Sequence, residues 1–160
     1  MGRKTSIEVY FALVNIYPES DFSLSTVTEK IGISPTTTQK KGEWFKPSDP
    51  NHGPFRPRQH PFTQWNYSTG IIETCDFEMV TMKIVDLFKD KVDIINELKR
   101  DLRLEPKFRA VTYIEEGISP GYSIPFEVMQ FAMSIGAEFD IDQYISEFVT
   151  EDIVDVIDME

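Results

Sequence analysis

The chain has 160 residues, of which 41% are hydrophobic and 12% aromatic, and its formal net charge is -11. This length and apolar content predict a single domain with one core, and the excess of acids argues against binding to nucleic acid phosphates. No apolar run approaches the ~20 residues that a membrane span requires, and no charged and apolar leader opens the chain. We therefore expect a cytoplasmic protein without a membrane segment.

Apolar spacing predicts a mixture of strands and helices along the chain. Residues 6–16 are apolar on both faces, which is typical of a central strand. A short helix follows, with Ser23 or Ser25 as its cap and Gly32 as its end. Further extended segments are predicted, in order, at residues 34–41, 62–69, 108–115, 117–123 and 138–145. Further helices are predicted at residues 76–88, with Asp76 as the N-cap, and at residues 91–102, 125–136 and 147–158.

This order of elements predicts an α+β fold, with a mostly antiparallel or mixed sheet and helices packed on one face. Each predicted element has an apolar face that would supply the core of such a domain. The large side chains expected in the core are Phe11, Leu13, Trp65, Val80, Leu87, Leu98, Val111, Phe131 and Ile141.

Residues 44–62 differ in composition, because they contain half of the chain's ten prolines. Proline at this density predicts a long, stiff loop without ladder pairing. Basic and aromatic side chains are interleaved in it, and we interpret Trp44, Phe45, Arg56 and Arg58 as candidate anchors for a protein partner. Two alternatives are that the aromatic rings pack onto the sheet while the cations pair with acids of the C-terminus, or that the loop stacks on single-stranded nucleic acid.

The acids gather at the C-terminus, where residues 138–160 include nine Asp or Glu and no Lys or Arg. We divide the chain into a domain at residues 1–146 and an acidic amphipathic tail at residues 147–160. A charge concentrated on one segment attracts basic protein surfaces. The tail acids expected to contact a basic partner are Glu147, Glu151, Asp152, Asp155 and Asp158.

No pattern for catalysis or metal binding emerges. His52 and His60 are eight residues apart in the proline-rich segment, which is not a metal-ligand spacing. Cys75 is the only cysteine and has an acidic neighbour, which opposes a reactive thiolate. Glycine-rich phosphate loops are also lacking. We therefore expect a non-enzymatic protein with no catalytic residue, no metal and no cofactor.

Three sequence segments, at residues 33–43, 65–69 and 136–144, resemble motifs of the DUF4279 family of small bacterial proteins. The first reads ISPTTT followed by KGE, the second WNYST and the third GAEFDIDQY. The resemblance extends over residues 6–146. It implies a fold for this chain but no activity, because the family has no established activity.

These observations lead to three hypotheses about function. The first is an immunity protein that neutralises a basic toxin or nuclease domain. The second is an accessory or anti-defence protein of a phage or mobile element. The third is a small-ligand-binding or enzymatic domain with a pocket near Lys41, Trp65 and Tyr144.

Overall fold

The structure is a computed structural model that describes residues 2–46 and 56–146. Its six-stranded sheet has the order β2-β3-β1-β5-β6, with β4 also paired to β1. The strands are β1 (Ser6–Asn15), β2 (Thr37–Gln39), β3 (Thr63–Ser68), β4 (Ile72–Glu73), β5 (Glu105–Ile114) and β6 (Glu138–Ile145). The helices are α1 (Leu24–Ile31), α2 (Phe77–Phe88), the 3-10 turn η1 (Lys89–Lys91), α3 (Val92–Leu102) and α4 (Phe126–Ile135).

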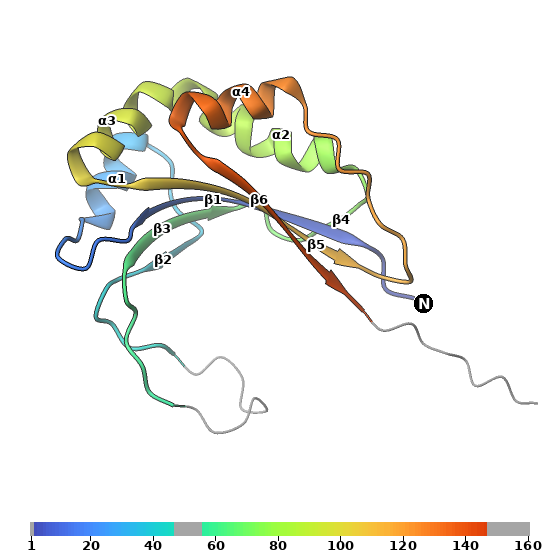
Figure 1. The fold of residues 1–160 in the computed structure, drawn as a ribbon, viewed down its shortest axis with the longest axis horizontal. Helices are drawn as coiled ribbons and strands as arrows, with labels where there is room; N and C mark the ends of the chain where they lie inside the picture. Colours follow the sequence, from blue (N-terminus) through green and yellow to red (C-terminus); the bar gives the residue numbers. More distant parts are fainter. Residues whose placement is uncertain (1, 47–55, 147–160) are drawn as a thin grey trace, which may run out of the picture.

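The helices lie together on one side of the sheet (Figure 1). All strand pairs are antiparallel except β5 and β6, which are parallel and are connected through α4. The predicted α+β domain with a mixed sheet and helices on one face is therefore confirmed. In the described ranges, no helix combines the length and the apolar character that crossing a bilayer demands.

Strand β1 lies between β3 and β5, as its two apolar faces predict. Its side chains under the helices are fully buried, and Phe11 is at their centre. The ring centroid of Phe11 is 6.4 Å from that of Trp65, 4.6 Å from that of Phe88 and 6.1 Å from that of Phe131. This aromatic cluster connects the sheet to α2 and α4.

The predicted helix ends are confirmed at three positions. The side chain of Ser23 accepts a hydrogen bond from the Thr26 amide, and that of Asp76 accepts one from the Met79 amide. Gly32 ends α1 with a φ of 75°, in the left-handed region that disfavours other residues.

Two members of the expected core are wrong, because Leu87 is 38% exposed and Ile141 is 37% exposed. The buried stripe of α2 includes Ile84 and Phe88. Leu87 is adjacent to Phe88 and is therefore rotated by about 100° around the helix, away from the sheet. Ile141 lies on β6, an edge strand with a neighbour on one side only, so fewer side chains surround it.

Some predicted boundaries also differ from the structure. Strand β5 begins at Glu105, three residues before the predicted start, and β4 was not predicted. Residues 117–123 form no strand and make only an isolated bridge between Glu115 and Ile118. The predicted helix at residues 147–158 lies outside the described residues.

The prediction that the proline-rich segment excludes ladder pairing is wrong for its described ends. The amide of Gly42 donates to the His60 carbonyl at 2.9 Å, His60 donates to Glu43 at 2.8 Å, and Phe45 donates to Arg58 at 2.9 Å. All three donors are residues other than proline, so the neighbouring prolines do not interrupt these bonds. We call residues 42–45 and 58–60 the ribbon. It continues from β2 and β3 and descends on the side of the sheet opposite the helices (Figure 1).

Candidate functional site

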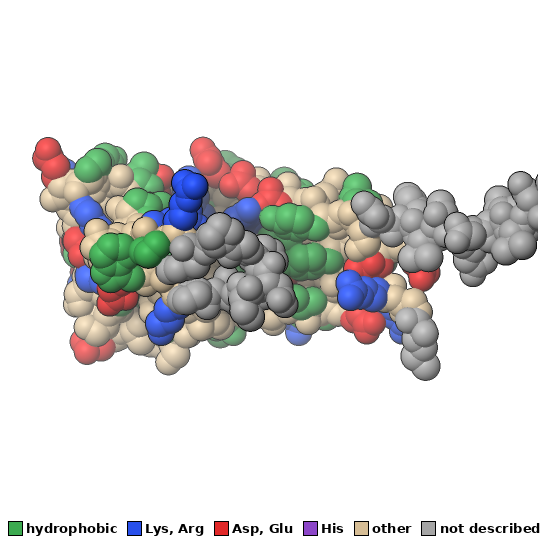
Figure 2. All heavy atoms as spheres, turned by 90° about the horizontal axis from the view of Figure 1, so that it is seen from below, with side chains coloured by type: hydrophobic (Ala, Val, Ile, Leu, Met, Phe, Trp, Pro, Cys, Tyr) green, Lys and Arg blue, Asp and Glu red, His purple; other side chains and the backbone are tan. Residues whose placement is uncertain are grey.

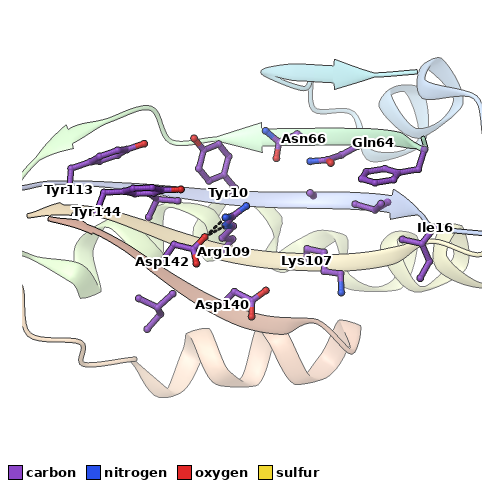
Figure 3. Close-up of a pocket in the computed structure, with 15 residues that line it drawn as sticks. Tyr10, Ile16, Gln64, Asn66, Lys107, Arg109, Tyr113, Asp140, Asp142 and Tyr144 are labelled. Atoms are coloured by element: carbon purple, nitrogen blue, oxygen red, sulfur yellow. Dashed lines mark hydrogen bonds and ion pairs between the residues drawn. The ribbon is translucent and has the colours of Figure 1, made fainter. Parts of the chain in front are cut away.

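The face of the sheet that the helices leave uncovered carries a hollow with a volume of about 750 Å³. Figure 2 shows this side, where exposed hydrophobic side chains lie near acidic and basic ones. The hollow is lined by side chains of β1, β3, β5 and β6. Its aromatic and charged lining residues include Tyr10, Arg109, Tyr113, Asp140, Asp142 and Tyr144 (Figure 3).

The strand pleat explains how β1 supplies both the core and this hollow. Successive side chains of a strand point to opposite faces. Because Phe11 points toward the helices, Tyr10, Ala12 and Val14 point to the uncovered face, where they line the hollow. Glu8 is on the same face by this alternation, next to Tyr10.

Most of the cationic charge on this face is already paired. The Arg109 guanidinium binds the Asp142 carboxylate through two nitrogens, with Nε 2.7 Å from Oδ2. Lys107 Nζ lies 3.5 Å from a Glu105 carboxylate oxygen and 3.6 Å from one of Glu138. Asp140 is the register partner of Arg109 but forms no ion pair with a described residue. Because Lys107 and Arg109 are already paired, acidic side chains on the uncovered face remain without a described cation as partner.

Glu8 is the second acid without a cation. Its side chain is buried, with the residue only 8% exposed, and no described Lys or Arg forms an ion pair with it. Burial raises the pKa of the Glu8 carboxyl, and a hydrogen bond with the Ser68 side chain opposes this rise. We did not single out Glu8 from the sequence. The available signal was that it is the only charged residue between positions 6 and 15.

Two tyrosines stack at the end of the hollow nearest Glu8. The rings of Tyr113 on β5 and Tyr144 on β6 are 5.7 Å apart with an interplanar angle of 17°. Figure 3 shows them side by side at one end of the hollow, with Tyr10 farther along the face. Burial raises the pKa of Tyr113, the negative charge of Glu8 and the proximity of Tyr144 add to the rise, and Arg109 opposes it. In the register of β1 with β5, Glu8 pairs with Val111, so Tyr113 lies on the same face two residues farther along β5.

The predicted loop anchors lie on or beside the ribbon. Phe45 stacks on His60 with ring centroids 3.8 Å apart, and the Arg58 guanidinium lies 4.3 Å from the centre of the Phe45 ring. Trp44 is 61% exposed, and Arg56 is exposed. The predicted tail contacts, Glu147, Glu151, Asp152, Asp155 and Asp158, lie outside the described residues.

The three residues expected around a small-ligand pocket are not brought together. Trp65 is fully buried on the side of the helices, where its Nε1 donates to Thr28 Oγ1 at 3.0 Å. Lys41 Nζ donates to the Pro18 carbonyl near the opposite end of the sheet. Tyr144 lines the hollow, and neither of the other two does.

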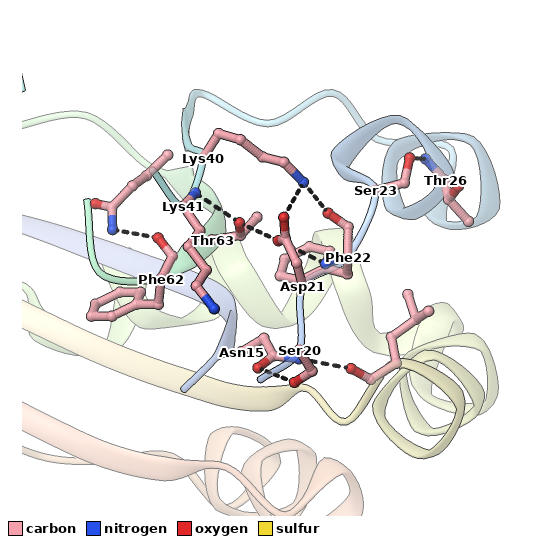
Figure 4. A network of polar contacts seen from close by, with 12 residues as sticks. Asn15, Ser20, Asp21, Phe22, Ser23, Thr26, Lys40, Lys41, Phe62 and Thr63 are labelled. Carbon is pink, nitrogen blue, oxygen red and sulfur yellow. Dashed lines mark hydrogen bonds and ion pairs between the residues drawn. The ribbon is translucent and has the colours of Figure 1, made fainter. Parts of the chain in front are cut away.

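Lys41 belongs instead to a network that fastens the segment after β1 to β3 (Figure 4). Asp21 accepts hydrogen bonds from the Thr63 hydroxyl and from the Phe22 amide, and it pairs with Lys40 Nζ at 2.9 Å. The backbone amide of Lys41 donates to the Thr63 hydroxyl at 2.9 Å. Burial raises the pKa of Asp21, but these partners outweigh it and the net pKa is lowered.

Metal ligation has no support in residues 2–46 and 56–146, where no three His, Cys, Asp or Glu side chains gather into a possible metal site. His60 is engaged in the ribbon, and Cys75 is an exposed free cysteine. The arrangement on the uncovered face suits binding through rings and carboxylates.

One comparison with known proteins finds a match. The model of the family described as Domain of unknown function (DUF4279) matches residues 4–146. No curated protein and no solved structure matches the chain at a significant level.

Proposed function

Given that this chain belongs to the DUF4279 family, whose description names no activity, we propose that it is a binding protein that neutralises a basic protein partner. The uncovered sheet face is the docking surface, and the ribbon flanks it. The partner class that fits best is a toxin or nuclease domain, which would make this chain an immunity protein or inhibitor.

This proposal rests on a difference between the two faces of the sheet, because helices cover only one of them. Four helices cover one face. The other face has a hollow of about 750 Å³ with aromatic and charged side chains. Aromatic residues and Arg are enriched in protein interfaces, and a hollowed sheet face with such residues can receive a protruding segment of a partner.

Charge favours a basic partner. On the uncovered face, Lys107 and Arg109 already pair with acids, whereas Glu8 and Asp140 have no cation among the described residues. The formal net charge of -11 for the whole chain has the same sign. Charges of one sign steer an oppositely charged partner and raise its association rate.

A small-ligand-binding domain is the second candidate, because a hollow of about 750 Å³ falls within the range of small-molecule sites. The location of this hollow on an open sheet face favours the larger partner. A role as a phage or mobile-element accessory protein uses the same acidic surface and differs from the first proposal in the identity of the partner.

The test uses the full chain and a basic partner captured from the source cells with it as bait. Reversing Glu151, Asp152, Asp155 and Asp158 to Lys is expected to slow association by roughly one to two orders of magnitude and to flatten its salt dependence. Substituting Trp44 with Ala is expected to speed dissociation instead, because an exposed ring is an anchor that acts after encounter. Surface plasmon resonance separates the two rates.

The matched control carries four Lys substitutions at exposed acids on the helices: Glu29, Glu78, Asp86 and Glu127. It has the same net charge as the tail variant. Equal slowing by both sets would mean that total charge, and not the tail, steers the partner. Capture of no basic protein by the wild-type chain would contradict the proposed function.

A further inference from the structure

We propose that the end of the hollow around Glu8 and the tyrosine pair is a site for a cationic group, and that one Lys or Arg side chain of the partner fills it. This inference rests on the proposed function and deepens it. The residues of the site are Glu8, Tyr10, Tyr113 and Tyr144.

The first argument is the unpaired charge of Glu8. Glu8 as a residue is only 8% exposed, so its carboxylate has lost part of its hydration, and no described Lys or Arg forms an ion pair that would compensate. Such a group destabilises the folded chain unless a cation or several hydrogen bonds compensate. A neutral side chain would suit the same position of β1 without this loss. Side chains that lower stability in this way are typical of functional sites.

The second argument is the aromatic surroundings. Tyrosine rings attract cations to their faces, most strongly where water is partly excluded. Tyr113 is two residues along β5 from Val111, the register partner of Glu8, so its ring and the stacked ring of Tyr144 lie at the same end of this face as Glu8. Tyr144 is 56% exposed, so the site is open to a partner. Tyr10 is opposite Ser68 in the register, and Ser68 hydrogen-bonds Glu8. Rings and carboxylate thus occupy one end of the face.

The third argument distinguishes a cation from an anion. Arg109 lines the hollow on this face, and its guanidinium already holds the Asp142 carboxylate through two nitrogens. An anionic ligand would have to displace Asp142 and approach Glu8 as well. A cation meets an unpaired carboxylate with no such competition. Lys and Arg carry their charge at the end of a long apolar stem, which suits a site lined by rings.

The test is a titration of the full-length, isotope-labelled chain with N-acetyl-lysine methylamide and with N-acetyl-arginine methylamide, followed by two-dimensional NMR at constant ionic strength. Saturable shifts are expected in the amides of β1, β5 and β6 around Glu8 and Tyr113. N-acetyl-glutamine methylamide, which lacks the charge, is expected to give none. Choline tests a free small cation, and tighter binding of choline than of both residue probes would overturn the assignment to a partner side chain.

The variants identify the groups responsible. Glu8→Gln is expected to weaken probe binding at least ten-fold, and Tyr144→Ala several-fold. The matched control is Glu78→Gln, which removes the same charge from the exposed surface of α2 and is expected to leave binding unchanged. Unchanged binding by Glu8→Gln, or an equal loss in Glu78→Gln, would overturn the site.

The same variants separate this inference from the proposed function. If the captured partner binds Glu8→Gln as tightly as the wild-type chain, the cation site is wrong and the docking proposal stands. If the residue probes bind at Glu8 and no basic protein is captured, the cation site stands and the proposed function fails.

Discussion

The two faces of β1 have different surroundings, although both are formed by the same ten-residue strand. Toward the helices, Ile7, Val9, Phe11 and Leu13 are all fully buried and apolar. On the uncovered side, Ala12 is also buried, but the same face carries Glu8, an acidic residue that is only 8% exposed. The face toward the helices carries only side chains whose burial favours folding. The uncovered face carries Glu8, whose burial opposes folding. This difference directs the search for function to the uncovered side.

The largest expected effect is on the covered face. Phe11→Ala removes a fully buried ring that contacts three others and is expected to lower the free energy of unfolding by about 3–5 kcal/mol. Tyr144→Ala on the uncovered face is the matched control, because Tyr144 is 56% exposed, and a change within about 0.5 kcal/mol is expected. Urea denaturation followed by circular dichroism measures both. Similar losses in the two variants would mean that the faces do not differ in this way.

A smaller effect is expected at Asp21, at the margin between the two faces. Asp21→Asn weakens the contact with Lys40, and because both side chains are partly exposed the loss at pH 7 is expected to be about 1 kcal/mol or less. The pKa of Asp21 is lowered in the folded chain, so its stabilisation is present above the unfolded pKa and is lost as pH falls through the folded pKa. Urea titrations of both proteins at several pH values from 7 downward check this. A difference that does not shrink as the pH falls below the unfolded pKa would contradict it.

The smallest expected effect is an increase in stability, in the variant Glu8→Gln. The pKa of Glu8 is raised in the folded chain by burial, so the folded state holds its proton more tightly than the unfolded state. Its contribution is favourable below the unfolded pKa and is lost as pH rises through the folded pKa. Glu8→Gln is therefore expected to raise the thermal midpoint at pH 7.5, with a gain that shrinks at pH 4. A variant that is less stable at pH 7.5 would mean that Glu8 is well solvated or paired.

Several elements could be predicted from local chemistry alone. A run that is apolar on both faces predicted the central position of β1, and Ser23, Asp76 and Gly32 predicted helix ends through their own backbone preferences. These signals reside within a few neighbouring residues, so they need no knowledge of the partners in space.

The features that were missed depend on contacts between distant residues. The ribbon requires residues 42–45 to meet residues 58–60, and the count of prolines does not reveal which amides remain available. Glu8 resembles an ordinary strand residue until the neighbours of β1 are known to be β3 and β5. The prediction of a pocket formed by Lys41, Trp65 and Tyr144 took no account of the side of the sheet on which each residue lies. The sheet separates Trp65 from Tyr144.

The central place of the first strand also affects how the chain is made. On the ribosome, β1 emerges before either of its long neighbours, β3 and β5. The Thr5 hydroxyl, just before β1, accepts a hydrogen bond from the amide of Glu115, 110 residues later in the chain. At a synthesis rate of about 5–20 residues per second, that delay is roughly 5–20 s. A ten-residue segment with two apolar faces therefore spends many seconds without its sheet, and the newly made chain is expected to depend on a chaperone during that interval.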